Sequence, residues 1–413
     1  MKVRTAAYET LKKIYLEDAY ANLALRQWKN HFSSAEQAFV TALVYGSMQN
    51  DLYTEYLWHP YTQKEPKKEI GILLNMAAYE LCFMSSPAYA VINEAVDLAK
   101  KEDKNSAKFV NFVLRRVAEK EKTEVSEEDE DRRLSLTYSM PLWIVKMWKK
   151  QYGYETTEKI LASFHTEHKQ YLRVNTLKTS KEELLKKDER FREEKGDAVS
   201  FAGNYIRTSY FKEGVIFPQD YHSQLVVEMA ELNPQDRILD VCAAPGSKTF
   251  QMAAVLKNEG EILAVDIYPS RVKLIESGAQ KAGADCIQTL TADGRDISAI
   301  LEENSFDVVF LDAPCSGLGT LRHKNDIKLR IQPEGLDEIQ QLQKELLEEA
   351  AKMVKTGGKL IYSTCTLNKK ENEKQIGAFL ERHKEYEAEE MRTCFPFEDD
   401  ADGFFMAKCR RIA

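Results

Sequence analysis

The sequence predicts a multidomain protein in which an all-α domain precedes an α/β domain with a mostly parallel, doubly wound sheet. Its 413 residues are enough for two or three domains. Up to about residue 120, apolar residues recur at three- and four-residue spacing, as expected for helices. From about residue 234, short runs rich in Val, Ile and Leu alternate with helical stretches, which favours a parallel sheet covered by helices on both faces.

The composition excludes several classes of protein. The chain is 43% hydrophobic and 30% charged, which is too apolar for a disordered protein. No run approaches the roughly 20 apolar residues that span a bilayer, and the first residues lack the apolar core of a signal peptide. The seven cysteines are an odd number without paired short spacing, and no Cys/His cluster has zinc spacing. We therefore expect a cytoplasmic protein with reduced thiols, no membrane segment and no metal.

The net charge is negative but unevenly distributed. Lys and Arg number 58 against 66 Asp and Glu, a net of −8. Residues 1–122 carry 17 basic and 15 acidic residues, a net of +2, which leaves 41 against 51, a net of −10, for the rest. An acidic protein can still bind RNA through a local basic surface, so the charge disfavours a nucleic-acid-binding protein without excluding one.

Residues 1–122 are expected to form a domain of six or seven helices. Its prolines fall between helical runs, where they are tolerated. The last run, SAKFVNFVLRRVAEK, places Lys108, Arg115 and Arg116 beside an apolar stripe. A solvated helix face is the simpler interpretation of these three residues, and an RNA contact is the alternative.

Two shorter segments follow before the α/β domain. Residues 123–169 are expected to be a linker and a joining helix, because 123–133 are strongly charged and MPLWIVKMWKKQYG is amphipathic. Residues 170–220 mix short strands with a charged helix and predict a small α/β unit. The remaining residues, 221–413, form the doubly wound domain, and its last two apolar segments could add antiparallel strands at one edge of the sheet.

The chemistry is expected where the parallel strands end, because ligands of open α/β sheets bind beyond the carboxyl ends of the strands. The first strand runs into a loop of small residues that opens a helix, and the next strands end in Asp266, Asp293 and Asp312. An acidic residue at the end of the second strand typically holds ribose hydroxyls, although Asp266 could instead cap the following helix. The loop residues are Cys242, Ala243, Ala244, Pro245, Gly246, Ser247 and Lys248.

This pattern favours a nucleoside cofactor. The loop matches neither a G-x-G-x-x-G fingerprint nor a phosphate-binding G-x-x-x-x-G-K-[ST] loop, which argues against ATP or GTP. Asp266 would bind the ribose, and Asp293 could reach the adenine amino group.

Two cysteines differ from the other five. A cysteine at a strand end is usually a small buried apolar residue, and this interpretation suits the five whose neighbours offer no activating group. Cys315 and Cys365 lie in the polar contexts APCSG and STCT at the ends of adjacent strands. Their thiols could approach one substrate, and Lys248 or a helix N-terminus could stabilise a thiolate there.

These motifs resemble those of the RNA cytosine-5 methyltransferase family, whose members use S-adenosylmethionine. The resemblance spans roughly residues 170–413, and the paired PC and TC motifs are its most specific part. The helical segments NEAVDLAK and FVNFVLRRV are similar to those of the NusB-type RNA-binding domain. The matching motifs are LDVCAAPGSKT, AVDIYPSR, LTADGRD, LDAPCSGLGTLR and YSTCTLNKKENE, with LRVNTLKTS, FPQDYHSQL and DGFFMAKC flanking them.

The resemblance implies roles for individual residues. Cys365 would be the nucleophile that adds to C6 of cytosine, and Cys315 would assist resolution of the covalent adduct. Asp312 would contact the cytosine edge and, with the loop Cys242 to Lys248, Asp266 and Asp293, would form the S-adenosylmethionine site of a Rossmann-like class I methyltransferase domain. The implied substrate is an unpaired cytidine in 16S ribosomal RNA, which the first domain and the small α/β unit of residues 170–220 would bind, and we expect a monomer.

Two other functions remain open at the level of sequence. A ribosome assembly factor could keep this fold without catalysis, although the presence of both cysteines argues against it. The same chemistry could also act on another nucleic acid, such as transfer RNA or DNA, since only the order of the domains favours ribosomal RNA.

Overall fold

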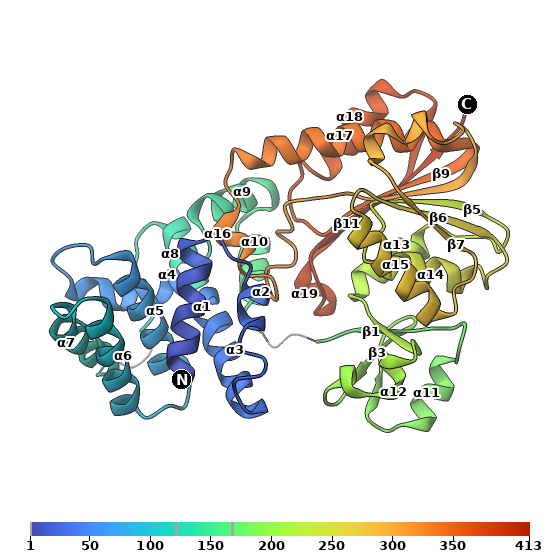
Figure 1. The fold of residues 1–413 in the computed structure, drawn as a ribbon. Helices are drawn as coiled ribbons and strands as arrows, with labels where there is room; N and C mark the ends of the chain where they lie inside the picture. The colour runs from blue at the N-terminus through green and yellow to red at the C-terminus, as the bar shows by residue number, and fades with distance from the viewer. Residues whose placement is uncertain (1, 120–122, 167–168) are drawn as a thin grey trace. The chain divides into compact units, whose positions relative to one another are not determined.

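The computed structural model describes residues 2–119, 123–166 and 169–413, which pack into two compact units. The first unit is helical and comprises the residues up to His165 together with His323–Ile331. The second comprises Thr166–Arg322 and Gln332–Ala413 and contains both sheets (Figure 1). The predicted order, an all-α domain followed by a mostly parallel α/β domain, is confirmed.

Amphipathic helices build the first unit around a core that includes Leu43, Leu73 and Val113, all fully buried. Ser33 accepts a hydrogen bond from the Glu36 amide and so caps α3, where an apolar run begins. Seven α-helices lie between Val3 and Ala118, within the expected six or seven. The helices are α1 (Val3–Leu16), α2 (Ala21–Arg26), α3 (Ser34–Gln49), α4 (Asp51–Trp58), α5 (Lys68–Phe83), α6 (Ala88–Glu102), α7 (Ser106–Ala118), α8 (Glu130–Thr137), α9 (Leu142–Tyr152) and α10 (Tyr154–Ser163), with the 3-10 helix η1 (His59–Tyr61).

The charged stretch 123–133 is helical at its end, where an exposed linker was expected. Asp129 accepts a hydrogen bond from the Arg132 amide and starts α8 at Glu130. Acidic residues in the first turn favour a helix because their negative charge interacts favourably with the partial positive charge at its N-terminal end. The expected joining helix is α9, and its Trp148 is fully buried in the helical unit.

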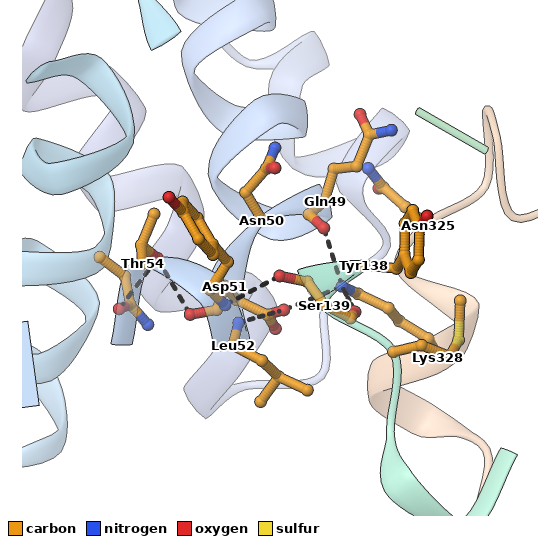
Figure 2. Close-up of polar contacts among 12 residues, drawn as sticks. Gln49, Asn50, Asp51, Leu52, Thr54, Tyr138, Ser139, Asn325 and Lys328 are labelled. Atoms are coloured by element: carbon orange, nitrogen blue, oxygen red, sulfur yellow. Dashed lines mark hydrogen bonds and ion pairs between the residues drawn. The ribbon is translucent and has the colours of Figure 1, made fainter. Parts of the chain in front are cut away.

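A short segment from the second half of the sequence packs within the helical unit. Its helix α16 (Ile327–Arg330) carries Lys328, whose ammonium group is almost fully buried. Lys328 Nζ donates to Asp51 Oδ1 at 2.8 Å, to the Ser139 carbonyl at 2.5 Å and to the Gln49 carbonyl at 3.2 Å (Figure 2). A buried cation with three acceptors ties this segment to α3, to α4 and to the connection between α8 and α9.

The second unit begins with a small antiparallel sheet of order β2-β3-β1-β4. Its apolar side chains form a separate small core that includes Leu172, Phe191 and Ile216. This arrangement agrees with the mixed pattern of residues 170–220. The elements are β1 (Leu172–Val174), α11 (Lys181–Lys187), β2 (Phe191–Glu193), β3 (Ala198–Phe201), η2 (Tyr205–Arg207), α12 (Ser209–Lys212) and β4 (Ile216–Pro218).

The main sheet has seven strands in the order β10-β11-β9-β8-β5-β6-β7. The five strands from β9 to β7 are parallel, and β11 and β10 add an antiparallel edge, as predicted. The strands are β5 (Arg237–Val241), β6 (Glu261–Asp266), β7 (Ile287–Thr291), β8 (Phe306–Asp312), β9 (Val354–Thr364), β10 (Tyr386–Cys394) and β11 (Phe404–Arg411).

Helices cover both faces of this sheet (Figure 1). Successive residues of one strand point to opposite faces, so Ile238 packs in the core with α13, α14 and α15, whereas Leu239 packs in the core with α17 and α18. The order of strands and helices places every β-to-α loop of the parallel strands at one edge of the sheet. The helices are α13 (Tyr221–Met229), α14 (Ser247–Val255), α15 (Pro269–Ala282), the 3-10 helix η3 (Gly294–Ala299), α17 (Gly335–Met353), α18 (Glu373–Arg382) and α19 (Pro396–Asp399).

None of the helices in the described residues is long and apolar enough to cross a membrane.

Candidate active site

The two cysteines singled out from the sequence lie side by side at the carboxyl ends of β8 and β9. Cys315 Sγ and Cys365 Sγ are 3.5 Å apart, and both residues are partly exposed. The parallel register that pairs Asp312 with Ser363 places the loop after β8 next to the residue that follows β9. The Gly319 amide donates to the Cys365 carbonyl at 3.1 Å and joins the two loops.

A lysine and a carboxylate form the charged part of the same edge. Lys248 Nζ, from the first turn of α14, lies 2.8 Å from Asp312 Oδ2. Ser363 Oγ donates to Asp312 Oδ1 at 2.7 Å, so both carboxylate oxygens have a donor. The ammonium group also lies 5.0 Å from the centre of the Phe404 ring. This arrangement fixes the orientation of Asp312 beside the cysteine loops.

The loop between β5 and α14 is closely packed against Asp266. The Ala244 amide donates to Asp266 Oδ2 at 3.3 Å, and Arg271 on α15 donates to the Ala244 carbonyl at 2.9 Å. Gly246 starts α14 with φ +102°, and a Cβ there would lie 2.5 Å from the Phe250 ring. Only glycine therefore fits at the helix start without strain.

Asp266 does not cap the following helix. Its Oδ1 accepts the Tyr268 amide at 3.2 Å, and Tyr268 itself is the N-cap residue of α15. The Tyr268 side chain is 57% exposed next to this nearly buried carboxylate. A carboxylate beside an exposed aromatic ring suits the ribose and base of a nucleoside.

Asp293 lies at the end of the next strand but is held by a neighbour. Its two carboxylate oxygens accept from Nε and Nη2 of Arg295, with a shortest distance of 2.6 Å. The hydrogen bond from Arg295 lowers the pKa of Asp293. Its contact with an adenine amino group stays a prediction.

Three of the other cysteines have thiols that burial makes harder to ionise. Burial raises the pKa of Cys242 to about 12, and the carboxylates of Asp266 and Asp312 add to the effect. Burial likewise raises the pKa of Cys394 and of Cys409 to about 12. These thiols stay protonated and fill space, as expected for cysteines at strand ends.

Comparison with known proteins identifies the family. The model of the 16S rRNA methyltransferase RsmB/F matches residues 227–410, that of the NusB family matches 1–119, and that of the RsmF/B-like ferredoxin-like domain matches 140–192. A probable ribosomal RNA small subunit methyltransferase B from Bacillus subtilis is 36% identical over 93% of this chain and 89% of its own length. The chain belongs to the RsmB/F methyltransferase family.

Solved structures agree with this assignment. PH0851 superposes with a TM-score of 0.80 at 26% identity and covers 98% of both chains. NSun6 from Pyrococcus horikoshii, solved with SFG, covers 65% of this chain and 97% of its own at a TM-score of 0.60 and 21% identity, so it supports the fold alone. The RsmB/F chain is therefore a methyltransferase with a NusB-like domain and a Rossmann-like domain.

Two further residues of this RsmB/F methyltransferase, Asn372 and Glu371, hold the cysteine loops and were not predicted from the sequence. Asn372 accepts from Thr364 Oγ1 at 2.6 Å and donates to the Thr366 carbonyl at 2.9 Å, so it holds both neighbours of Cys365. Glu371 bonds to the residue after Cys315. Both residues belong to the KKENE part of the quoted motif, whose charges are typical of a solvated segment.

No group of three His, Cys, Asp or Glu side chains among the described residues is arranged to hold a metal ion.

Proposed function

We propose that this methyltransferase methylates C5 of an unpaired cytidine in 16S ribosomal RNA through a covalent adduct between Cys365 and C6 of the base. The observation that carries the proposal is the pair of thiols 3.5 Å apart at the edge of a class I methyltransferase sheet. Membership of the RsmB/F family and the names of its relatives supply the RNA and the subunit. A cytidine must be unpaired or flipped out to reach such a pocket.

The chemistry requires a nucleophile because C5 of cytosine does not attack a methyl donor unaided. The Cys365 thiolate adds to C6, and the electron pair of the C5–C6 double bond makes C5 nucleophilic. C5 would then take the methyl group that S-adenosylmethionine supplies when bound, and the S–CH3 bond would break to leave S-adenosylhomocysteine. Loss of the C5 proton to a base restores the double bond and expels the thiolate of Cys365. Cys315 assists this last stage, in which the adduct is resolved.

The surroundings of the two thiols support this division of roles. The hydrogen bond to Cys365, followed by burial, raises the pKa of Cys315 well above its usual value. The negative charge of Glu371 acts in the same direction. A Cys315 thiol that keeps its proton can donate it to the Cys365 sulfur 3.5 Å away. A thiol that donates to Cys365 stabilises the Cys365 thiolate for attack.

Asp312 acts on the base. Lys248 and Ser363 hold its carboxylate at the carboxyl end of β8, three residues before Cys315. In a site from which RNA and protein exclude water, a fixed carboxylate accepts a hydrogen bond from the cytosine edge and favours protonation at N3 during attack. Lys248 holds this carboxylate in its orientation.

The residues between β5 and β7 fit S-adenosylmethionine, which supplies a methyl group on a sulfonium centre. Asp266 would bind the ribose hydroxyls, and the exposed Tyr268 and Ile267 would offer apolar surface to the adenine ring. The loop from Cys242 to Lys248 would hold the cofactor beside the start of α14, where Gly246 packs against the Phe250 ring because it has no side chain. Asp293 remains the candidate for the adenine amino group.

The helical unit offers a surface for RNA on α7. Lys108, Arg115 and Arg116 are exposed, and the Arg116 guanidinium lies 5.7 Å from the centre of the exposed Phe112 ring. Cations beside an aromatic ring are the groups that bind phosphates and stack on unpaired bases. A hollow of about 470 Å³ adjoins this surface, and its lining includes Tyr61, Lys64, Lys67, Phe109 and Phe112.

The test uses cells with and without the gene and the two cysteine variants. Bisulfite sequencing of 16S ribosomal RNA should show one 5-methylcytosine that is lost on deletion and restored by the wild-type gene. Cys365→Ala should abolish methyl transfer while S-adenosylmethionine still binds, and Cys315→Ala should trap a protein–RNA adduct that survives denaturing electrophoresis. Cys286→Ala is the control, because this half-buried thiol lies outside the pair.

Three results would contradict the proposal. A site lost from transfer RNA instead would show the same chemistry on another substrate. If Cys365→Ala fully restored ribosome assembly in the deletion strain without restoring methylation, the protein would be an assembly factor. Turnover by purified Cys365→Ala would remove this residue from the role of nucleophile.

A further inference from the structure

Glu371 is a fully buried carboxylate at the base of the two cysteine loops. Its two oxygens accept four hydrogen bonds, from the Ser316 amide at 2.9 Å, Ser316 Oγ at 2.6 Å, Asn368 Nδ2 at 3.0 Å and Gln343 Nε2 at 3.1 Å. All four partners are donors, and an ionised carboxylate can only accept. The surroundings therefore match the charged form of Glu371.

The donors come from both loops. Ser316 directly follows Cys315, and Asn368 lies three residues after Cys365. Gln343 on α17 uses its second hydrogen for the Pro314 carbonyl at 2.9 Å, so the residues on both sides of Cys315 are held by one cluster. The Glu371 backbone takes part as well, because its carbonyl accepts from Tyr362 OH at 2.7 Å.

The hydroxyl groups in this cluster have one consistent direction of donation. Ser316 has a single hydroxyl hydrogen and gives it to Glu371. Thr366 Oγ1 lies 2.6 Å from Ser316 Oγ, so the Thr366 hydroxyl must be the donor in that pair. Thr366 Oγ1 in turn accepts the Leu318 amide at 3.3 Å. The residues immediately after the two cysteines are thus joined in a chain of hydrogen bonds that ends on Glu371.

We propose that Glu371 is a positioning residue that sets the distance and relative orientation of the Cys315 and Cys365 thiols. The proposal rests on the proposed function, since the paired thiols carry the chemistry there. Glu371 touches neither sulfur in the hydrogen-bond network; it acts through Ser316 and Thr366. A buried carboxylate with all of its donors in place is rigid, whereas loss of its charge leaves the donors of both loops without a strong acceptor.

The test compares Glu371→Gln with the exchange variant Asn368→Asp/Glu371→Gln. In the single variant, the new side-chain amide presents a hydrogen to a position where Ser316 and Asn368 both donate. In the exchange variant, this amide instead donates to the carboxylate introduced at position 368 and to Ser316 Oγ, whose hydroxyl turns toward Thr366. The oxygen of the new amide accepts from the Ser316 backbone amide and from Gln343. Apart from the Thr366 hydroxyl hydrogen, which loses Ser316 Oγ as its acceptor, the hydrogen bonds of the cluster are then satisfied again with the same total charge.

Single-turnover methylation is measured on 16S ribosomal RNA from cells that lack the gene. Glu371→Gln is expected to lower the rate about 100-fold, the loss typical of small misplacements of reacting groups. The Kd values for S-adenosylmethionine and RNA should stay within about twofold, because no residue of either site is removed. The exchange variant should methylate at least about tenfold faster than Glu371→Gln. Glu373→Gln is the matched control, because Glu373 bonds to Thr393 rather than to a cysteine loop.

A second measurement reports the thiol pair without methyl transfer. Phenylarsine oxide binds two neighbouring thiols through arsenic, with release of one water molecule, and its Kd should rise in Glu371→Gln and recover in the exchange variant. Wild-type rates and arsenical affinity in Glu371→Gln would overturn the proposal, as would equal losses in Glu373→Gln. If the arsenical Kd rises in Glu371→Gln and recovers in the exchange variant, but wild-type enzyme methylates no cytidine in 16S ribosomal RNA, the proposed function fails while the positioning of the thiols by Glu371 is upheld.

Discussion

Replacement of Lys328 by Met tests whether a buried ion pair holds the 323–331 segment in the helical unit. Lys328 and Asp51 expose only 3% and 10% of their side chains, so water does little to screen either charge. Met has nearly the same length and removes only the ammonium group. Asp51 would then keep its bonds from Tyr15 OH and the Leu52 amide but lose its cation.

The magnitude follows from the burial of both partners. Removing one member of a buried pair costs about 3–5 kcal/mol, because the other charge remains without compensation. At about 2–4 °C per kcal/mol for a unit of this size, Lys328→Met should lower the Tm of the helical unit by roughly 6–20 °C. Lys324→Met removes the same charge from an exposed position of the same segment and should shift Tm by less than about 2 °C.

Differential scanning calorimetry and hydrogen exchange measure the two consequences. Amides of α16 should exchange faster in Lys328→Met, since their segment is no longer held. Asp51→Asn combined with Lys328→Met should cost less than the sum of the single changes, because no uncompensated charge remains. Equal Tm values for Lys328→Met and Lys324→Met, with unchanged exchange of α16, would refute the reasoning.

Two further predictions concern the second unit. A Cβ at Gly319 would lie 2.0 Å from the Gly403 carbonyl oxygen and 2.9 Å from that of Cys365. Gly319→Ala should therefore lower the free energy of unfolding by about 1–3 kcal/mol, seen as a lower Tm, and should also lower the methylation rate. Gly377→Ala, whose Cβ meets no atom within 4 Å, should lower neither Tm nor rate. Burial raises the pKa of Asp240 to about 7, so its contribution to stability is fully present below the ordinary pKa of an aspartate and is lost as the pH rises through about 7. Between about pH 5.5 and about pH 8.5, the Tm of Asp240→Asn should therefore fall less than the Tm of the wild type. Equal falls in Tm would contradict the burial argument.

The main sheet was predictable because its signal is local. Runs such as RILDV and FDVVFLD are short, apolar and rich in branched residues, and they correspond to β5 and β8. Once the strands are placed, the topology of a parallel sheet brings Asp266, Asp312 and the residues after β9 to one edge. The proximity of Cys315 and Cys365 follows from that geometry and did not require knowledge of side-chain packing.

The path of residues 323–331 could not be predicted in the same way. Nothing in HKNDIKLRI separates it from the neighbouring residues of the α/β domain. Its anchor, Lys328, bonds to Asp51 and Ser139, which lie 277 and 189 positions away in the sequence. Periodicity describes neighbours within one helix or strand, so a contact between such distant segments leaves no local pattern.

The burial of Glu371 could not be predicted from its neighbours in the sequence. It stands in NKKENEK, where five of seven residues are charged, and such runs are usually solvated. The residue is fully buried because Ser316, Asn368 and Gln343 supply donors that compensate for the lost hydration. Sequence alone could not distinguish it from Glu373, two positions later.

Lys328 and Glu371 share a physical property that explains why each governs the segment around it. An ion removed from water loses several kcal/mol of hydration and regains it only when all of its partners are in place. A slightly displaced apolar contact loses little, but a displaced donor leaves the ion unpaired, so the energy rises steeply with distance. Buried ions therefore act as geometric constraints more than as sources of net stability. At Lys328 the constraint fixes where residues 323–331 lie, and at Glu371 it fixes how the loops that carry Cys315 and Cys365 face each other.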